Sequence, residues 1–167
     1  MKTAEENQMK KIIPFLWFDS EAEQAAKFYV GIFKNSKIGK ITRYGEDGPR
    51  PKGSVMTVEF TLDRVEFVAL NGGPQFKFTE AISFSVNCED QDEIDYFWEK
   101  LSADGGSTPE SFRGWLKDKF GLSWQVNPVF LDDMLGDPDA GKANRVMKAM
   151  MQMDKIDIAA LEKAARG

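Results

Sequence analysis

The pattern of apolar and polar residues occurs twice along the chain, with a spacing of 69 residues. Each copy predicts a short apolar strand, an acidic turn and an amphipathic helix. The matching pairs are Ile13 and Ile82, Phe15 and Phe84, Phe28 and Phe97, Tyr29 and Trp98, and Ile32 and Leu101. Self-similarity at a fixed spacing is typical of one structural module used twice. The pattern therefore predicts two similar halves related by a pseudo-twofold axis.

The first half begins with an apolar run over 11–18 that predicts a strand. Ser20 and Glu23 then form a capping-box pattern before an amphipathic helix expected over 21–33. Three further strands follow, and the last two are joined by a tight turn at Asp63 and Arg64. These strands are expected over 37–44, 54–62 and 65–70.

The second half repeats this order and continues into helices. Its strand is expected over 81–86, its helix over 90–103 and a closing hairpin over 115–118 and 122–128. A return strand near 107–112 has the weakest pattern. Helices are then expected over 131–135, 139–151 and 158–165, with Asp157 as an N-cap.

These elements predict an α+β fold, in which two βαβββ modules with pseudo-twofold symmetry form a concave mixed sheet, followed by C-terminal helices. Residues 1–10 are polar and acidic, lack the apolar core of a signal peptide, and predict a flexible N-terminal tail. Residues 11–167 are predicted to form a single domain. Its parts are module one over about 11–74, module two over about 75–130 and C-terminal helices over about 131–166.

Composition narrows the classes of partner and the compartment. The formal net charge is −5 and the pI is about 4.9, which argues against an electrostatic nucleic-acid surface. The single cysteine, Cys88, has no partner for an internal disulfide, which fits a reducing compartment. No apolar run is long enough to span a membrane. A cytoplasmic location is therefore expected.

The chain contains no histidine. Histidine is the most frequent general base at neutral pH and the most frequent transition-metal ligand. Its absence leaves only other side chains for acid–base catalysis or metal binding. A nucleophilic role for Cys88 is not expected, because no histidine can activate its thiol.

Four ordered motifs resemble the PhnB-like branch of the vicinal-oxygen-chelate superfamily, which includes glyoxalase I and bleomycin-resistance proteins. They are Pro-Phe-Leu-Trp-Phe-Asp at 14–19, Ala-Leu-Asn-Gly-Gly-Pro at 69–74, Phe-Thr-Glu-Ala at 78–81 and Gly-Leu-Ser-Trp-Gln-Val at 121–126. Members of this branch often carry the label 3-demethylubiquinone-9 3-methyltransferase. The resemblance covers about residues 11–166 and implies a glyoxalase-like domain. It does not fix a reaction, because one fold hosts many chemistries.

The resemblance also implies where a metal would bind. By motif position, the superfamily's ligands fall on Ile12, Ala69, Ala81 and Gln125. Divalent metals take carboxylate, imidazole or thiolate ligands, and one amide does not replace four of them. We therefore expect no bound metal and no cofactor.

Side chains alternate across a strand, so the parity of these positions predicts the lining of the cavity. The candidate ligand-binding residues are Asn71, Ser83, Ser85, Trp115, Ser123, Gln125 and Asn127, with Trp115 as a possible wall. The competing interpretation of the serines is that they are solvated strand hydroxyls. The opposite parity places Phe15, Trp17, Phe84 and Trp124 in the core beneath the helices. Glu59 is a weak catalytic candidate, expected to be the one strand carboxylate that enters the cavity, and a solvated surface acid is its alternative.

Three functions remain open from the sequence. The first is a protein that binds a small organic molecule in a metal-free cavity, like the bleomycin-resistance relatives. The second is a metal-independent enzyme acting on a small aromatic or quinone-like substrate through Glu59, oriented by Gln125 and Asn127. The third is the methyltransferase of the family label, although no Gly-x-Gly turn for S-adenosylmethionine occurs. The resemblance implies a homodimer, and neither a nucleic-acid nor a membrane partner is expected.

Overall fold

The apolar strands of the first half form a four-stranded mixed sheet in the computed structural model, which describes residues 11–108 and 113–167. The elements are β1 (Phe15–Phe18), α1 (Ala22–Ile32), β2 (Lys37–Arg43), β3 (Val55–Leu62) and β4 (Val65–Asn71). The strand order is β1-β4-β3-β2, with β1 parallel to β4 and the other neighbours antiparallel. This first unit ends at Lys77. It has the predicted βαβββ order.

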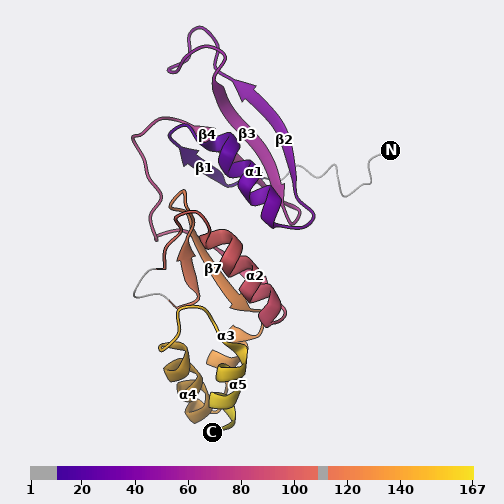
Figure 1. Cartoon of the computed structure of the whole chain (residues 1–167), viewed down its shortest axis with the longest axis vertical. Coiled ribbons are helices and arrows are strands. Elements are labelled where there is room, and N and C mark those ends of the chain that lie inside the picture. The colour runs from indigo at the N-terminus through magenta and orange to yellow at the C-terminus, as the bar shows by residue number, and fades with distance from the viewer. Residues whose placement is uncertain (1–10, 109–112) are drawn as a thin grey trace, which may run out of the picture. The chain divides into compact units, whose positions relative to one another are not determined.

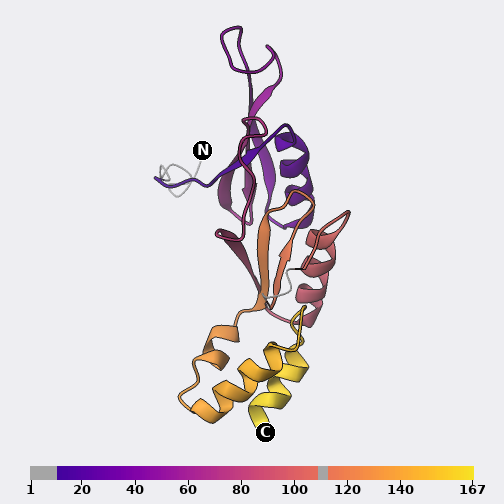
Figure 2. The ribbon, with the colours of Figure 1, turned by 90° about the vertical axis from the view of Figure 1, so that its left-hand side faces the viewer.

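Helix α1 covers one face of this sheet (Figures 1 and 2). Its small residues Ala25 and Ala26 are fully buried and allow close approach to the strands. The ring of Tyr29 stacks on Phe60 with centroids 6.2 Å apart, and Phe60 stacks on Phe67 at 5.4 Å. Aromatic stacking of this kind stabilises beyond the area it buries. The core of the first unit therefore lies between α1 and the face of the sheet that carries Phe60 and Phe67.

The turn between β3 and β4 contains Asp63 and Arg64, both with positive φ, 40° and 70°. Leu62 and Val65 pair directly on either side of it. A two-residue hairpin with positive φ at both central residues matches the right-handed twist of its strands. The predicted tight turn is confirmed.

The second unit begins at Phe78 and contains a three-stranded mixed sheet. Its elements are β5 (Ser83–Cys88), α2 (Gln91–Ser102), β6 (Trp115–Lys117) and β7 (Ser123–Pro128). The order is β5-β7-β6, with β5 parallel to β7 and β6 antiparallel to it. The carboxylate of Asp90 accepts a hydrogen bond from the backbone N of Glu93 at 2.9 Å and caps α2. Of the weak return strand, Ser107 forms an isolated bridge with Lys117, and 109–112 lie outside the described residues.

Three helices complete the second unit: α3 (Leu131–Leu135), α4 (Ala140–Met150) and α5 (Ile158–Arg166). Asp139 and Asp157 cap α4 and α5, so the predicted cap at Asp157 is confirmed. The guanidinium of Arg145 donates to the carbonyls of Ala164 and Ala165, which joins α4 to the end of α5. Within the described ranges, no helix is both long and apolar enough to cross a membrane.

Two local predictions for the first strand and helix are wrong. The strand begins at Phe15 instead of residue 11. The capping box of Ser20 and Glu23 does not form, since Glu23 pairs with Lys27. The amide oxygen of Asn71 accepts the hydrogen bond from the backbone N of Ala22 instead, at 2.8 Å. A side chain from β4 therefore satisfies the N-terminus of α1, a long-range contact that local patterns do not show.

The predicted faces of β1 and β4 are reversed. Leu16 and Phe18, expected in the cavity, are 5% and 4% exposed, whereas Phe15, expected in the core, is 63% exposed. On β4, Phe67 pairs with Phe60 beneath α1, and Leu16 pairs with Ala69. Trp17 lies on the opposite face with Phe15 and is half-buried. The prediction for β3 is confirmed, because Val58 and Phe60 are buried and Glu59 is exposed.

The reversal has a simple geometric cause. Three residues separate β1 from α1, but two separate β5 from α2. The buried helix positions Ala25 and Ile32 match Ile94 and Leu101 at the spacing of 69, whereas the buried strand positions match at 70. These strand pairs are Leu16 with Val86 and Phe18 with Cys88. A shift of one residue moves every side chain of a strand to the other face.

Candidate functional site

Five of the predicted ligand-binding residues share one face of the second sheet. We name Ser83, Ser85, Ser123, Gln125 and Asn127 the polar row. Ser83 pairs with Ser123, and Ser85 pairs with Gln125, across the parallel strands β5 and β7. The opposite face carries the buried residues Val86, Trp124 and Val126, and α2 packs on β7. The predicted faces are confirmed for Val86, Trp124 and Val126, but Ile82, which has the core parity, is 68% exposed.

Hydrogen bonds connect the polar row. The amide nitrogen of Gln125 donates to the hydroxyl of Ser83 at 2.9 Å. The amide nitrogen of Asn127 points to the amide oxygen of Gln125 at 3.4 Å, which is long for a hydrogen bond. The hydroxyl of Ser85 lies 3.5 Å from the amide oxygen of Asn87. The side chains of the row therefore orient one another from Asn127 through Gln125 to Ser83.

Two buried polar atoms of the row have no hydrogen-bond partner among the described residues. They are the hydroxyl oxygen of Ser123 and the amide oxygen of Asn127. Ser123 is fully buried, at 0% exposure. Buried polar atoms in proteins are nearly always hydrogen-bonded to protein, water or ligand. Both atoms are enclosed by protein, so they are polar groups left unsatisfied inside this face of the sheet.

Trp115 and Lys117 lie on the same side of the sheet, because Trp115 pairs with Gln125 and Lys117 with Ser123. The ammonium of Lys117 forms an ion pair with Glu80. The hydrogen bond from Lys117 is the main cause that lowers the pKa of Glu80 below its usual value. The positive charge next to the polar row is therefore balanced within the same unit.

The β6–β7 hairpin that holds the row is fixed by one buried carboxylate. Asp118 accepts hydrogen bonds from the backbone N of Phe120 at 2.8 Å and of Leu122 at 3.1 Å. Its second oxygen accepts one from the indole nitrogen of Trp124 at 2.9 Å. Gly121 has a φ of 85°, a conformation that glycine adopts without strain. The carboxylate thus ties the turn to the core residue beside Gln125.

Asn71, the remaining predicted ligand-binding residue, belongs to the first unit and is 6% exposed. Besides accepting from Ala22, its amide donates to the carbonyl of Val55 at 3.1 Å. Its own carbonyl accepts from the hydroxyl of Tyr44 at 2.6 Å. Asn71 therefore holds together the N-terminus of α1, β3 and the loop after β2, and a ligand-binding role for it stays a prediction.

Glu59, the weak catalytic candidate, is exposed on the face of the first sheet that α1 leaves open. It pairs with Val68, and Thr61 pairs with Glu66 on the same side. From the sequence, Glu59 was expected to be the one strand carboxylate on that face. This expectation is wrong, because the reversed parity of β4 places Glu66 on the same face. A catalytic role for Glu59 stays a prediction.

Two residues of the second unit were missed by the sequence argument. Asn87 continues the alternation of Ser83 and Ser85 by one more step and pairs with Asn127. Extending the strand by two residues would have found it. Lys117 was hidden by its place in a three-residue strand, where no alternation is visible.

The residues at the superfamily's metal positions do not fit a metal. Ile12, Ala69 and Ala81 offer no donor atom in their side chains, and Gln125 uses its amide within the polar row. In 11–108 and 113–167, no group of three or more His, Cys, Asp or Glu residues is arranged to hold a metal ion. No metal-dependent step can be derived for this chain.

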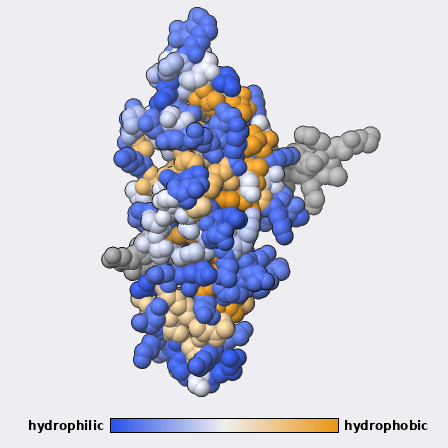
Figure 3. Space-filling view, in the orientation of Figure 1, coloured by the Kyte–Doolittle hydropathy of each residue, from blue (hydrophilic) through white to orange (hydrophobic). Residues whose placement is uncertain are grey.

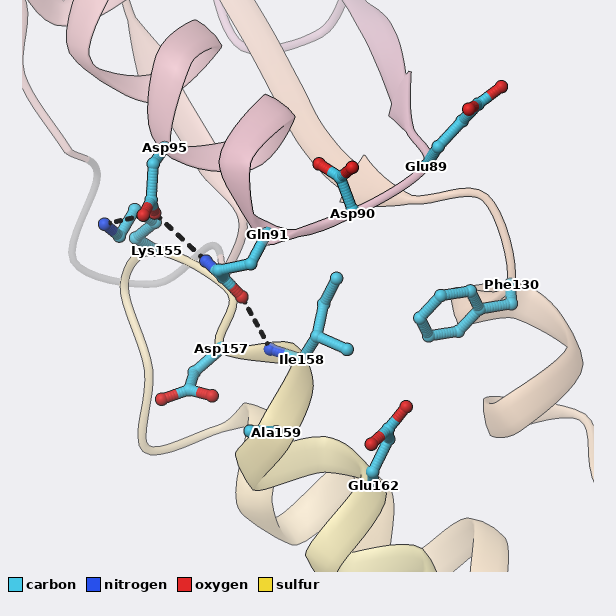
Figure 4. A pocket seen from close by; sticks show the side chains of 10 residues that line it. All are labelled: Glu89, Asp90, Gln91, Asp95, Phe130, Lys155, Asp157, Ile158, Ala159 and Glu162. Carbon is cyan, nitrogen blue, oxygen red and sulfur yellow. Dashed lines mark hydrogen bonds and ion pairs between the residues drawn. The ribbon is translucent and has the colours of Figure 1, made fainter.

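A separate pocket of ≈ 580 Å³ lies between the N-termini of α2 and α5 (Figure 4). Its lining contains five acids, and three of them serve the fold: Asp90 and Asp157 cap the two helices, and Asp95 pairs with Lys155 at 2.6 Å. The hydrogen bond from Lys155 is the main cause that lowers the pKa of Asp95. We therefore assign this pocket a structural role.

Apolar residues are also exposed on both units. Figure 3 shows hydrophobic patches among the hydrophilic residues of the surface. The exposed large apolar side chains include Phe15, Phe76, Val129, Met147 and Met151. Phe76 packs edge-on against Trp17 with centroids 4.9 Å apart, and the indole nitrogen of Trp17 donates to the carbonyl of Gly73 at 2.9 Å. These apolar patches lack the built hydrogen-bonding groups of the polar row.

The chain matches one family of known proteins. The family model described as 3-demethylubiquinone-9 3-methyltransferase matches residues 10–127. Among solved structures, PhnB protein from Bacillus cereus is 40% identical, with a TM-score of 0.63 over 71% of this chain and 99% of that one. No match was found among curated proteins.

More distant structures share the fold. Protein PA1353 from Pseudomonas aeruginosa is 21% identical, with a TM-score of 0.57 over 72% of this chain and 98% of that one. The fosfomycin resistance protein FosX from Listeria monocytogenes, complexed with Mn(II) and sulfate, is 14% identical, with a TM-score of 0.51 over 77% and 97%. At these identities the likeness concerns the fold alone.

Proposed function

The chain belongs to the 3-demethylubiquinone-9 3-methyltransferase family, the PhnB-like branch of the vicinal-oxygen-chelate superfamily, and from this premise we propose that it binds a small organic molecule without a metal. The polar row of the second sheet is the contact surface.

The observation that carries this proposal is the gathering of hydroxyl and amide side chains on one face of β5 and β7, where Ser85 is exposed and Gln125 is half-buried. The hydroxyl of Ser123 is fully buried, so it is not a contact for a ligand. The amide of Gln125 can be reached, and a typical hydrogen bond from it to a ligand contributes about 0.5–1.5 kcal/mol.

The chemistry of the row indicates the class of ligand. Its five side chains are neutral hydroxyls and amides, and the nearby Lys117 is balanced by Glu80. Among the described residues, the row itself therefore offers no unpaired charge to a charged ligand. The ring of Trp115 beside Gln125 offers an apolar surface for a flat group. A neutral, partly aromatic molecule with hydrogen-bonding groups fits best.

The methyltransferase description finds no support in the residues. Enzymes of the common S-adenosylmethionine class bind the cofactor at a glycine-rich turn between a parallel strand and a helix. The turns after β1 and β5 are Asp19-Ser20-Glu21 and Glu89-Asp90, without glycine. A binding protein is therefore the better proposal, located in the cytoplasm as its single buried Cys88 favours.

The test is a thermal-shift screen of neutral aromatic amides, phenols and quinones, with S-adenosylmethionine as a separate arm. Binding to the native state raises the melting temperature. For each hit, Gln125→Ala should weaken binding by about 1–3 kcal/mol, because the ligand loses a hydrogen-bonding partner. The exposed Gln152→Ala is the matched control and should bind as the wild type does.

Three outcomes would overturn the proposal. The first is a screen without a hit, and the second is a set of hits whose affinities are equal in Gln125→Ala and the wild type. The third is saturable binding of S-adenosylmethionine, which would make the family's methyltransferase description the better proposal.

A further inference from the structure

A segment beyond the family match returns to the edge of the polar row. The match ends at Asn127, and α3, α4 and α5 lie after it. Residues 154–158, which are the end of the loop between α4 and α5 and the first residue of α5, run beside the start of β6. The carbonyl of Asp154 accepts a hydrogen bond from the backbone N of Gly114 at 2.8 Å. The carboxylate of Asp154 also pairs with the guanidinium of Arg113 at 2.9 Å.

The first residue of α2 fixes this segment from the other side. The amide nitrogen of Gln91 donates to the carbonyl of Ile156 at 3.1 Å, and its amide oxygen accepts from the backbone N of Ile158 at 2.9 Å. Figure 4 shows Gln91 between Asp95 and Ile158. The amide nitrogen of Gln91 is itself held by the carboxylate of Asp95 at 3.0 Å. Between these contacts, the side chain of Ile156 is fully buried.

Gly114 connects the segment to the polar row. Its φ is +73°, and its carbonyl accepts a hydrogen bond from the backbone N of Val126 at 2.7 Å. A Cβ atom at Gly114 would lie 2.3 Å from the amide oxygen of Asn127 and 3.2 Å from Cγ1 of Ile156. Gly114 therefore contacts both the side chain of Asn127 and the side chain of Ile156.

Packing against Gly114 matters because hydrogen bonding holds Asn127 weakly. The bond from Asn127 to Gln125 is 3.4 Å long, and the amide oxygen of Asn127 has no hydrogen-bond partner in the described part of the chain. A side chain with so little hydrogen bonding takes its orientation from the atoms it touches. Among these is the backbone of Gly114.

We propose that the 154–158 segment positions the Asn127 side chain in the polar row, with Ile156 and Gln91 as the positioning residues. The segment acts through Gly114 and touches no ligand. The functional importance of this positioning rests on the proposed function, because the position of Asn127 affects binding only if the polar row is the ligand site. It makes the helices beyond the family match part of the site.

The experiment observes the side-chain amide of Asn127 directly by NMR, in full-length protein labelled with 15N-asparagine. The Asn127→Gln variant assigns the signal, and the side-chain amide of Asn35, in the first unit, is the internal reference. Ile156→Ala and Gln91→Ala should each move the Asn127 signal by more than its line width. Ile156→Val, which keeps most of the contact with Gly114, should leave it close to the wild-type position.

Leu161→Ala is the matched control, because Leu161 is also fully buried in the C-terminal helices, but the atoms nearest to Gly114 belong to Asn127 and Ile156. Its Asn127 signal should stay in place even though the protein is less stable. An unmoved signal in folded Ile156→Ala or in Gln91→Ala would overturn the proposal, as would an equal movement in Leu161→Ala. If Ile156→Ala does not fold, Gln91→Ala decides alone.

This measurement needs no ligand. A failed ligand screen with a moved Asn127 signal would count against the proposed function alone. An unmoved signal together with a successful screen would count against the positioning role alone.

Discussion

Trp124 and Gln125 are adjacent in β7 but face opposite sides of the sheet, so truncating each should lower the free energy of unfolding by very different amounts. Trp124 is 3% exposed, packs against Phe84 with ring centroids 5.7 Å apart, and donates to Asp118. Gln125 is half-buried and donates to Ser83. Trp124→Ala tests the core side of the strand, and Gln125→Ala tests the side of the polar row.

The magnitudes follow from these contacts. Truncating a buried tryptophan costs about 3–5 kcal/mol through lost packing and the cavity it leaves. An oxygen of the buried Asp118 also loses its donor, which adds about 1–3 kcal/mol. The sum approaches the total stability of many domains, which is about 5–15 kcal/mol. Gln125→Ala should cost about 1 kcal/mol or less, because water can replace the amide at the hydroxyl of Ser83.

Trp124→Phe separates the two parts of the larger effect. A phenyl ring keeps much of the packing but offers no N–H, so the expected loss is mainly the about 1–3 kcal/mol of the unpaired Asp118 oxygen. Asp118 still accepts from the backbone of Phe120 and Leu122 in this variant.

The assay is urea unfolding followed by far-ultraviolet circular dichroism, which does not depend on the tryptophan that is changed. The free energy of unfolding comes from linear extrapolation for each variant. Because the chain divides into two units, a single transition has to be shown with a second probe before the values are compared. A Gln125→Ala protein less stable than Trp124→Ala would refute the face assignment of β7, and with it the polar row.

Four further outcomes are expected. Elemental analysis should find no stoichiometric zinc, nickel, manganese or iron in the purified protein, and chelator should leave its melting temperature unchanged; one metal per chain that survives dialysis would contradict the site as described. Sedimentation equilibrium should show a homodimer, and a single 18.8 kDa species at tens of micromolar would refute this. Burial, and secondarily Glu93 and Asp90, raises the pKa of Cys88 to about 12, so a thiol reagent at pH 8 should modify it only after unfolding in urea. The pKa of Asp95 is lowered in the folded state, so its ion pair with Lys155 stabilises the protein above the usual pKa of a carboxyl group. This stabilisation is lost as the pH falls through the folded-state pKa. Asp95→Asn should therefore have a lower melting temperature than the wild type at pH 6 and the same melting temperature in acid.

Most of the fold could be predicted because strand and helix periods are local properties of the sequence. The α+β class, the βαβββ order of the first unit and the C-terminal helices follow from these periods. The polar row also follows, since alternation along β5 and β7 separates hydroxyls and amides from the apolar residues. Its use by a ligand stays a prediction.

The faces of β1 and β4 could not be predicted by carrying a constant spacing from helix to strand. A turn absorbs one extra residue without disturbing the helix after it, but the strand before it then changes face relative to its counterpart. Pairing Phe60 with Phe67 would have predicted the correct face of β4, because both rings have to lie on the same side of adjacent strands. The role of Asn71 as the cap of α1 was hidden for another reason: it joins residues 49 positions apart.

The parallel pairing of the first and last strands of each unit has a kinetic consequence. Among residues 11–108 and 113–167, β1 pairs with β4 alone and β5 with β7 alone, so each unit closes when its final strand arrives. The β3–β4 hairpin has local contacts and can form early, whereas the parallel pairs have to bring distant segments together at an entropic cost. Until then both edges of β1 and β5 present unpaired backbone groups that another chain can bind, whereas in the native sheets each strand keeps one unpaired edge. Folding at high protein concentration therefore competes with association through these two strands, and dilute refolding favours the native units.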